Sequence, residues 1–345
     1  MKSKMRIMPI LLVLFSLTGA CVPLEQASEA TLPPTESVVT ISAETVDQLI
    51  SVQTLTFDEA VILRWTSDGS AFWVQGVRTA ALYDSRSLQE IASYDVSEYG
   101  ILYDVSPDGR LIAYALEEPD IILYDVITQQ ETGHIPVDTY VQNVAFSPDG
   151  TVLGASSMDE WKVSLWDTKT QQEIKTLTGF ETAAPVYSFQ YGADGKTILW
   201  ISRGTVQPQD IESETLVPKI NHEDFISCVA LSPDGKYLAS AAAGTVEGEF
   251  KPIVTIWDAH TGESLAVFSD ADYFSALAFS PDGSLLAAGG KNKVFFWDIV
   301  DFRSAGEIST DGECVNSLQF SPDGIFLLIS GTNGSLRILH TIGHE

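Results

Sequence analysis

Positively charged residues are scarce in this sequence of 345 residues. Lysine and arginine total 19 against 47 aspartates and glutamates, so the formal net charge at pH 7 is −28. Nucleic acid is a poor partner for such a chain and is not expected to bind, because phosphates are bound by clustered Lys and Arg. An acidic surface attracts cationic groups, and it also keeps a protein soluble. The charge therefore predicts either a protein partner with a basic surface or a merely solvated exterior.

Cysteine is also rare, with three residues in the chain. Cys228 and Cys314 stand ahead of different repeats, which argues against a disulfide between them. Neither cysteine has the spacing of a metal site, and the five histidines form no His-Glu-x-x-His pattern. The chain has no Gly-x-Ser-x-Gly elbow, phosphate loop or dinucleotide fingerprint. The sequence therefore predicts a non-catalytic protein without a cofactor or metal site.

Long hydrophobic runs are missing as well. The apolar run Ile7–Leu17, interrupted by Pro9, is too short for a transmembrane helix. It follows a basic start and precedes the small residues Gly19 and Ala20, a pattern that predicts a secretory signal peptide over residues 1–20. Cys21 after small residues resembles the lipobox of bacterial lipoproteins, which implies a lipid on its thiol; ordinary secretion is the alternative.

Residues 21–40 are expected to form a lipid-anchored flexible tether. Pro, Ser, Thr and Glu dominate residues 22–37, and such a composition cannot bury a core. Together with the signal peptide, this tether predicts an exported lipoprotein on the extracytoplasmic side of a bacterial envelope. Its contact with the membrane would be the lipid on Cys21.

The sequence does contain a repeated tetrapeptide, Ser-Pro-Asp-Gly. Pro at its second position favours a type I turn, and Gly at its end favours the left-handed conformation that starts the next strand. Apolar runs flank each copy, so each predicts a β-hairpin. Five intact copies and two degraded ones end at glycines spaced 40 to 48 residues apart: Gly69, Gly109, Gly150, Gly195, Gly235, Gly283 and Gly324.

An aromatic-Asp pair follows five of the turns at a second regular position, as in Trp166-Asp167 and Trp257-Asp258, and Gln209-Asp210 and Leu339-His340 stand there as weaker copies. It marks the end of a third strand, such as Lys162–Trp166, and a fourth strand follows a short turn, as in Glu173–Leu177. Four strands in each of seven units predict an all-β, seven-bladed β-propeller with four-stranded blades over residues 41–345.

The chain resembles the WD-repeat β-propeller family, in particular the bacterial kind rich in Ser-Pro-Asp-Gly turns. The resemblance covers roughly residues 48–345. The chain departs from the family because it lacks the usual Gly-His before the first strand of each repeat. Only Asn221-His222 comes near to that pair. The family's His–Asp–Ser–Trp hydrogen-bond network is therefore expected to be absent from most blades. The fold hosts unrelated activities, so the resemblance predicts the fold far better than the function.

The last repeat has three strands, and one strand too many stands upstream of the first turn. An unfinished blade would expose an edge. The segment Leu49–Thr56 is therefore predicted to complete the last blade from the N-terminal side, with a short helical turn just ahead of it in Ser42–Gln48.

Function is expected on the loops that join consecutive blades, because variable loops on a rigid scaffold are usual binding sites. Twelve carboxylates and no Lys or Arg occur in this set of loops, often beside an aromatic residue. The loops between second and third strands share the face, and the longest of them spans Gly244–Pro252. The predicted partner-binding residues are Tyr99, Tyr140, Trp161, Glu223, Asp224, Phe225, Asp270, Asp272, Tyr273 and Phe274.

The sequence thus predicts a monomeric extracytoplasmic scaffold that recognises a basic protein partner through this acidic loop face. The alternative is an enzyme or small-ligand receptor with its site at the mouth of the central channel.

Overall fold

The computed structural model describes residues 38–57, 61–76, 78–95, 103–115, 120–137, 140–157, 162–178, 188–202, 204–269 and 273–342. All of them belong to one compact unit, Thr31–Glu345. The predicted signal peptide, Cys21 and most of the predicted tether lie outside the described residues. Strand β1 (Val38–Val39) lies inside the range predicted as tether, so regular structure begins at least three residues before residue 41.

The described residues form antiparallel β-sheets and one short 3₁₀ helix, η1 (Val46–Gln48). Five sheets have four strands each. The first sheet has β3 (Ile62–Trp65), β4 (Ala71–Gln75), β5 (Thr79–Asp84) and β6 (Glu90–Asp95), and the second has β7 (Tyr103–Val105), β8 (Leu111–Ala115), β9 (Asp120–Asp125) and β10 (Gln130–Pro136). The third has β11 (Val141–Phe146), β12 (Val152–Ser157), β13 (Lys162–Asp167) and β14 (Glu173–Thr178), and the fourth has β15 (Ser188–Tyr191), β16 (Thr197–Ile201), β17 (Thr205–Asp210) and β18 (Ile220–Asn221). The fifth has β19 (Cys228–Leu231), β20 (Tyr237–Val246), β21 (Glu249–Asp258) and β22 (Ser264–Phe268).

The sixth sheet has seven strands. They are β1, β2 (Leu49–Thr56), β23 (Phe274–Phe279), β24 (Leu285–Asp298), β25 (Arg303–Phe320), β26 (Phe326–Gly331) and β27 (Ser335–Ile342). The prediction of seven separate four-stranded sheets is therefore not reproduced, because hydrogen bonding gives six. Strands β24 and β25 each continue through a predicted loop, and the pair Lys291↔Cys314 joins the last two repeats into one sheet.

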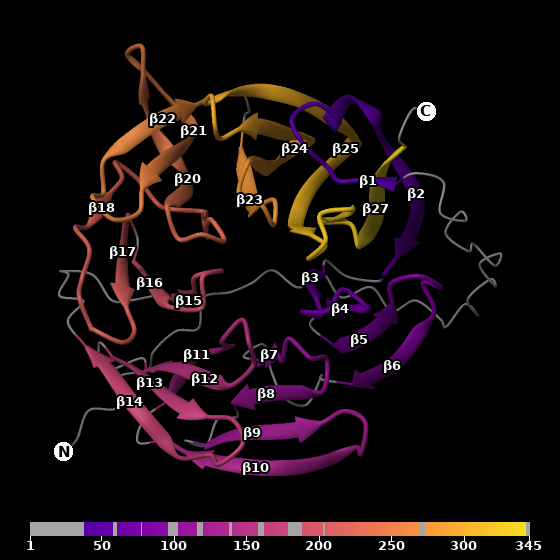
Figure 1. Ribbon diagram of the computed structural model, residues 1–345, viewed down its shortest axis with the longest axis vertical. Coiled ribbons are helices and arrows are strands. Elements are labelled where there is room, and N and C mark those ends of the chain that lie inside the picture. Colours follow the sequence, from indigo (N-terminus) through magenta and orange to yellow (C-terminus); the bar gives the residue numbers. More distant parts are fainter. Residues whose placement is uncertain are drawn as a thin grey trace, which may run out of the picture. The chain divides into compact units, whose positions relative to one another are not determined.

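The predicted closing strand is present with its predicted bounds. Strand β2 pairs with β27 in an antiparallel register from Leu49↔Thr341 to Thr56↔Ser335. Strand β1 adds a further short pairing with β27, between Val39 and Thr341. The two ends of the described chain therefore meet in one sheet, as Figure 1 shows for β1, β2 and β27. Strand β2 therefore covers the edge of β27 that would otherwise be open to solvent.

Seven clusters of buried apolar side chains hold the described part of the chain together. Most contain residues from two successive sheets, such as Trp73 and Ile112 in the cluster between the first and second sheets. One joins the last sheet to the first through Leu63 and Leu336. The sheets therefore form a closed ring, the arrangement of an all-β propeller (Figure 1).

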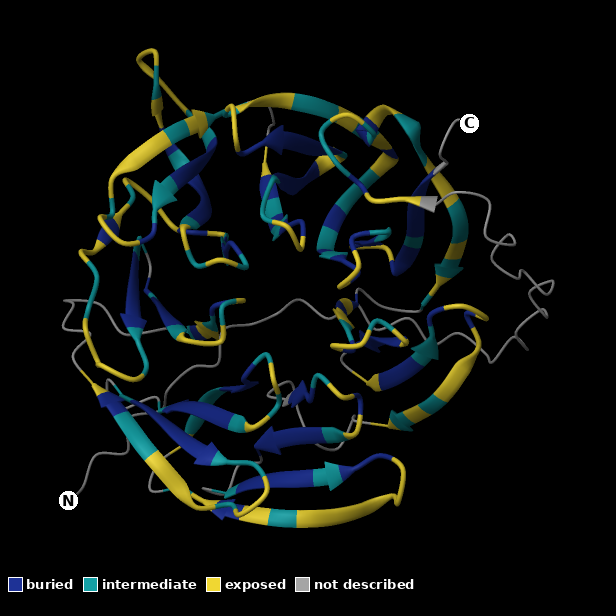
Figure 2. Ribbon diagram, in the orientation of Figure 1, coloured by how far each residue is buried: buried dark blue, intermediate teal, exposed yellow. Residues whose placement is uncertain are grey.

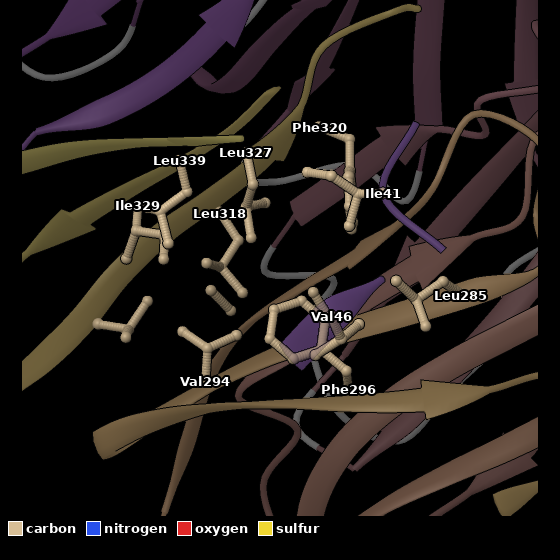
Figure 3. Packing of buried hydrophobic residues seen from close by; sticks show 13 residues of the cluster. Ile41, Val46, Leu285, Val294, Phe296, Leu318, Phe320, Leu327, Ile329 and Leu339 are labelled. Atoms are coloured by element: carbon tan, nitrogen blue, oxygen red, sulfur yellow. The ribbon is translucent and has the colours of Figure 1, made fainter. Parts of the chain in front are cut away.

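The remaining cluster lies within the seven-stranded sheet (Figure 3). Leu285 and Phe296 of β24 pack there with Leu318 and Leu327 of β25 and β26. The amide of Ile299 donates to the carbonyl of Ser284 at 2.8 Å, so β24 returns on itself to its own beginning. The two halves of this sheet consequently face each other across a core, as neighbouring sheets do elsewhere.

The repeated tetrapeptides form the predicted turns. In the third repeat, Ser147 Oγ donates to Asp149 Oδ1 at 2.7 Å and accepts from the Val152 amide at 3.0 Å. Gly150 has φ +72°, a conformation that favours glycine. All seven turn glycines share this left-handed conformation, with φ between +66° and +74°. The local chemistry of the tetrapeptide therefore explains the hairpin in every repeat.

These turns also touch one another around the ring. A Cβ added to Gly150 would lie 3.2 Å from Cδ of Pro107 in the preceding turn. Gly69 in the first turn faces Pro322 in the last one in the same way, at 3.6 Å. The exception is Gly195, which has no such neighbour within 4 Å. The turns thus close a circle of contacts, which is interrupted at the fourth repeat.

Candidate functional site

The candidate site is the face formed by the loops between sheets and the loops between second and third strands; we call it the loop face. Two contacts show that these two sets of loops meet. Glu313 accepts hydrogen bonds from Asn333 Nδ2 at 2.7 Å and from Ser335 Oγ. Glu223, in the segment after β18, accepts from Thr245 Oγ1 of β20 at 2.8 Å. The shared face that the sequence predicts is therefore present in these two regions.

Part of the predicted site lies outside the described residues, namely Cys21, Tyr99, Trp161, Asp270 and Asp272. Of the twelve predicted loop carboxylates, five are described: Asp95, Glu223, Asp224, Asp311 and Glu313. The described residues nevertheless include uninterrupted pieces of the loop face, among them the segment between β18 and β19.

That segment, His222–Ser227, is held at both ends. The His222 amide donates to the carbonyl of Gly204 at 2.8 Å, and Ile226 is buried with 4% of its surface exposed. Between these anchors Glu223, Asp224 and Phe225 are exposed. Phe225 has 55% of its surface exposed. The segment therefore presents two carboxylates and one aromatic ring in a defined geometry.

His222 anchors the segment to the sheet behind it. Its Nε2 lies 2.8 Å from Ser240 Oγ, and Trp257 Nε1 donates to the same Oγ at 2.7 Å. Burial lowers the pKa of His222 to about 4, so the ring is neutral near pH 7 and accepts the Ser240 proton at Nε2. This His–Ser–Trp chain occurs at the one place where the sequence came near to the family's Gly-His.

Two further predicted residues are exposed on neighbouring loops. Tyr140 has 60% and Tyr273 has 51% of its surface exposed. Ser227 Oγ donates to the carbonyl of Phe274 at 2.9 Å, which brings the loop of Phe225 next to the loop of Tyr273. Phe274 itself was predicted to contact a partner, and that prediction is wrong. It is 2% exposed and packs on Phe295 and Trp297, because successive residues of β23 point to opposite faces.

Asp311 and Glu313 serve the fold more than the loop face. They were expected in a loop, yet they lie within β25, where Asp311 and Gly312 have positive φ and kink the strand. Arg337 pairs with Asp311 at 2.9 Å and donates to the Thr310 carbonyl at 3.2 Å. Together with the bonds from Asn333 and Ser335 to Glu313, these contacts occupy both carboxylates.

The sequence reasoning missed Phe250. It lies on β21 near the end of the long β20–β21 hairpin, which extends away from the other sheets in Figure 1 and is largely exposed in Figure 2. Phe250 has 59% of its surface exposed, with Glu247 and Glu249 beside it. The unusual length of Gly244–Pro252 signalled the hairpin, but alternation alone could not show that this ring lacks a covering strand.

The inner strands offer a different kind of site. Arg64 Nε of β3 pairs with Asp104 Oδ1 of β7 at 3.0 Å, and the Phe146 amide of β11 donates to Asp104 Oδ2 at 2.8 Å. Asp104 therefore ties three successive sheets together, and burial raises its pKa. The charges of Arg64 and Asp104 neutralise each other. Within the described ranges no three His, Cys, Asp or Glu side chains gather as metal ligands do.

Comparison with known families places WD repeats in four stretches of this chain. The family described as "WD domain, G-beta repeat" matches residues 127–167, 215–247, 253–298 and 305–339, together less than half of the chain. The first match begins ahead of β10, the outer strand of one sheet, and ends in β13, the third strand of the next. The first three matches each include strands of two neighbouring sheets, whereas the fourth lies within the seven-stranded sheet that β2 completes.

Curated relatives match parts of the chain at low identity. A "Periodic tryptophan protein 2 homolog" of Dictyostelium discoideum is 24% identical over 202 residues, or 54% of this chain and 20% of the relative. "Periodic tryptophan protein 2" of Arabidopsis thaliana is 29% identical over 129 residues, covering 37% and 13%. "WD repeat-containing protein SL1-17" of Schistosoma mansoni is 29% identical over 150 residues, covering 41% and 47%. The chain spans less than half the length of each of these relatives.

These relatives contradict the predicted location on a bacterial envelope. They are eukaryotic proteins with Periodic tryptophan or WD-repeat names, and none of them is named as a bacterial lipoprotein. The pattern behind that prediction was a basic start, a short apolar run and a small-residue step, which is compositional and says little about cell type. No helix within the described ranges is both long and apolar enough to cross a membrane.

Proposed function

We propose that the chain is a WD-repeat propeller in which the seven-stranded sheet acts as two blades. Four matched repeats support membership of the family. The apolar cluster between the two halves of that sheet and the return of β24 on itself support the count of seven blades. Seven turn glycines with one common conformation agree with it.

We further propose that this propeller is a non-catalytic scaffold that recognises a basic protein partner through the loop face. The observation that carries the proposal is the segment His222–Ser227. It holds Glu223, Asp224 and Phe225 outward between the half-buried His222 and the buried Ile226. The backbone of the segment therefore needs little further ordering when a partner binds. Exposed aromatics beside carboxylates can stack on Arg or cover the stem of Lys while the carboxylates attract its charge.

An enzyme or small-ligand receptor at the channel mouth receives less support. Arg64 and Asp104 on the inner strands pair with each other, and Asp104 is committed to the Phe146 amide as well. Their polar groups therefore brace the sheets and leave little charge for a ligand.

The test is capture of partners by immobilised protein from a native extract, followed by quantification of each captured protein. The loop-face variant Glu223→Gln, Asp224→Asn, Phe225→Ser is compared with the wild type. A matched control, Glu90→Gln, Glu212→Gln, Glu263→Gln, removes three exposed carboxylates near the turns that follow third strands. The proposal expects basic proteins that are captured by the wild type and the control and lost with the loop-face variant. Equal capture by all three proteins would refute it.

A further inference from the structure

A cavity among the described residues lies away from the segment His222–Ser227, in the wedge between the first and second sheets. It has a volume of about 250 Å³. Its floor is formed by Ile112 and Tyr114 of β8, which are 3% and 2% exposed. Tyr94 of β6 and Tyr124 of β9 form its walls, and both are half-buried. Three tyrosines from two neighbouring sheets therefore surround one space.

The ring orientations are fixed by hydrogen bonds and by mutual packing. Tyr94 and Tyr124 lie with ring centroids 5.7 Å apart and planes at 72°, so they form a corner. The Tyr94 hydroxyl donates to the carbonyl of Val126, and the Tyr114 hydroxyl donates to Glu131 Oε1 at 3.4 Å. A corner of aromatic rings with fixed orientation is the arrangement that binds quaternary ammonium groups.

The rim of the cavity is polar and carries negative charge. It consists of Ser93, Asp95 and Gln129, all of them exposed. None of the residues that line the cavity is cationic. Two basic side chains on the same sheet have acidic partners: Arg110 pairs with Asp125 at 2.7 Å, and His134 lies 3.2 Å from Glu131 and 2.9 Å from Asp120. An anion would therefore meet no cationic side chain among the lining residues, whereas a cation would meet aromatic rings and a rim that includes Asp95.

This wedge differs from the corresponding one at the fifth sheet. Tyr114 stands five residues after its turn glycine, as Ser240 does in the fifth sheet, and Tyr124 precedes Asp125 as Trp257 precedes Asp258. At the fifth sheet the ring of His222 closes the space by contacting Ser240 and Trp257. The second sheet has tyrosines at both positions, and both of them line the cavity.

We propose that this wedge cavity binds an alkylated ammonium cation, either a small quaternary amine or a methylated lysine side chain. A volume of about 250 Å³ is below the ~300–1,000 Å³ that drug-sized ligands occupy, and suits a single cationic headgroup. The net charge of −28 favours a cation over a neutral ligand of the same shape. The proposal does not depend on partner binding by the loop face.

The test is a ligand-observed NMR titration of the full chain with choline. Its uncharged isostere 3,3-dimethylbutan-1-ol serves as the matched control ligand. We expect choline to bind at least tenfold more tightly, with its methyl signals shifted upfield by the ring faces. Equal affinity for the two probes, or no saturable binding of choline, would overturn the proposal. Saturable binding of glucose at the same rings without binding of choline would overturn it too, because such a site would be one for sugars.

Variants then assign the binding to the three tyrosines. Tyr124→Phe keeps the ring and is expected to bind within about twofold of the wild type, whereas Tyr124→Leu loses at least tenfold. Asp95→Asn, at the exposed rim, weakens binding without affecting the core and serves if Tyr124→Leu fails to fold. Tyr140→Leu on the loop face leaves choline binding unchanged. Loss of choline binding in Tyr140→Leu with retention in Tyr124→Leu would contradict the assignment.

Peptides identify the source of the cation. A peptide that contains trimethyl-lysine is titrated beside the same peptide with unmodified lysine. Preference for the trimethylated peptide by at least tenfold supports a methylated side chain as the ligand. Binding of choline alone supports a small amine, and binding of the two peptides with equal affinity contradicts recognition of the alkylated headgroup.

Discussion

Six of the seven repeats place two aspartates at fixed positions, and the seventh has His340 at the second of them. The carboxylates of these aspartates accept hydrogen bonds within the turns, as the third repeat shows. Asp149 accepts from Ser147 and from the Thr151 amide, whereas Asp167 accepts from the amides of Lys169 and Thr170 at 3.1 and 2.7 Å. The bonds from Thr170 lower the pKa of Asp167. The aspartates of these turns therefore stabilise the fold. Recognition of a partner is expected to depend on the carboxylates outside the turns.

His222 makes stability sensitive to pH. Its pKa is lowered to about 4 in the folded protein, whereas an unfolded chain protonates the same ring near 6.5. The unfolded state therefore binds more protons between these values, and the free energy of unfolding falls as the pH decreases from about 6.5 to 4. We expect a loss on the order of 2 kcal/mol across this window, after allowance for the partial exposure of the ring. Denaturant unfolding at pH 7 and at pH 4.5 measures it.

The matched variant is His222→Asn, which removes the titration. Its free energy of unfolding should be lower than that of the wild type at pH 7 and should change much less between pH 7 and pH 4.5. Carboxylates of lowered pKa, such as Asp167 and Asp258, lose their contribution mainly below pH 3.8, outside this window. An equally steep pH dependence in His222→Asn would mean that another group titrates.

The turn glycines allow backbone strain to be separated from contact between turns. Gly195→Ala should cost about 1 kcal/mol, because alanine at a φ of +66° is strained but meets no neighbour within 4 Å. Gly150→Ala should cost roughly twice as much, because its Cβ must also displace Pro107. Thermal unfolding of the two variants measures the difference. Equal losses would show that contacts between turns contribute nothing to the closed ring.

At the scale of strands, local chemistry made most of the fold predictable from the sequence. The turns follow from bonds between residues two to five positions apart, such as those of Ser147, Asp149 and Val152. The closing strand β2 followed from counting strands, because a blade with three would have an open edge. The seven-stranded sheet was not predictable, since the pair Lys291↔Cys314 depends on how two distant segments continue past their loops.

The candidate site was predictable only in part. Glu223, Asp224 and Phe225 were identified because a loop rich in acids and aromatics is recognisable in sequence. Phe274 was misjudged because it follows the exposed Tyr273 directly, and only the register of β23 decides which of the two rings enters the core. The tyrosine cavity was missed because its walls come from different repeats.

Truncation tests the closing strand. Deletion of residues 1–37 removes none of the strands described here and should leave the melting temperature nearly unchanged. Deletion of residues 1–57 removes β1 and β2 and exposes the edge of β27. It also removes Val52, Leu55 and Phe57, which pack against the apolar cluster that joins the last sheet to the first. Burial of three such side chains contributes roughly 5 kcal/mol, so we expect a fall of at least about 10 °C or aggregation.

The comparison between the two truncated proteins is made by calorimetry and size-exclusion chromatography. Equal melting temperatures, with both proteins monomeric, would show that the ring does not need the N-terminal strand. A large fall in melting temperature on deletion of residues 1–37 would place essential contacts upstream of Val38.

At the scale of the whole molecule, an all-β ring carries a net negative charge and displays some of its carboxylates on a rigid face. The segment His222–Ser227 is fixed by His222 and Ile226, and the β20–β21 hairpin beside it adds Phe250. Field from the net charge of −28 raises the encounter rate with basic proteins, and the exposed rings supply contact area. Charge is therefore expected to govern how fast a partner associates, and aromatic contact how long it stays.

The central claim is that the loop face attracts its partner by charge. It is tested most directly by the association rate constant of a captured basic partner, measured at ionic strengths from about 0.01 to 0.5 M, over which the Debye length falls from about 30 Å to a few ångströms. The account predicts a rate that falls steeply with salt for the wild type and for the Glu90, Glu212 and Glu263 control, and a lower rate with a shallower slope for Glu223→Gln, Asp224→Asn. Identical rates and slopes for all three proteins would contradict it.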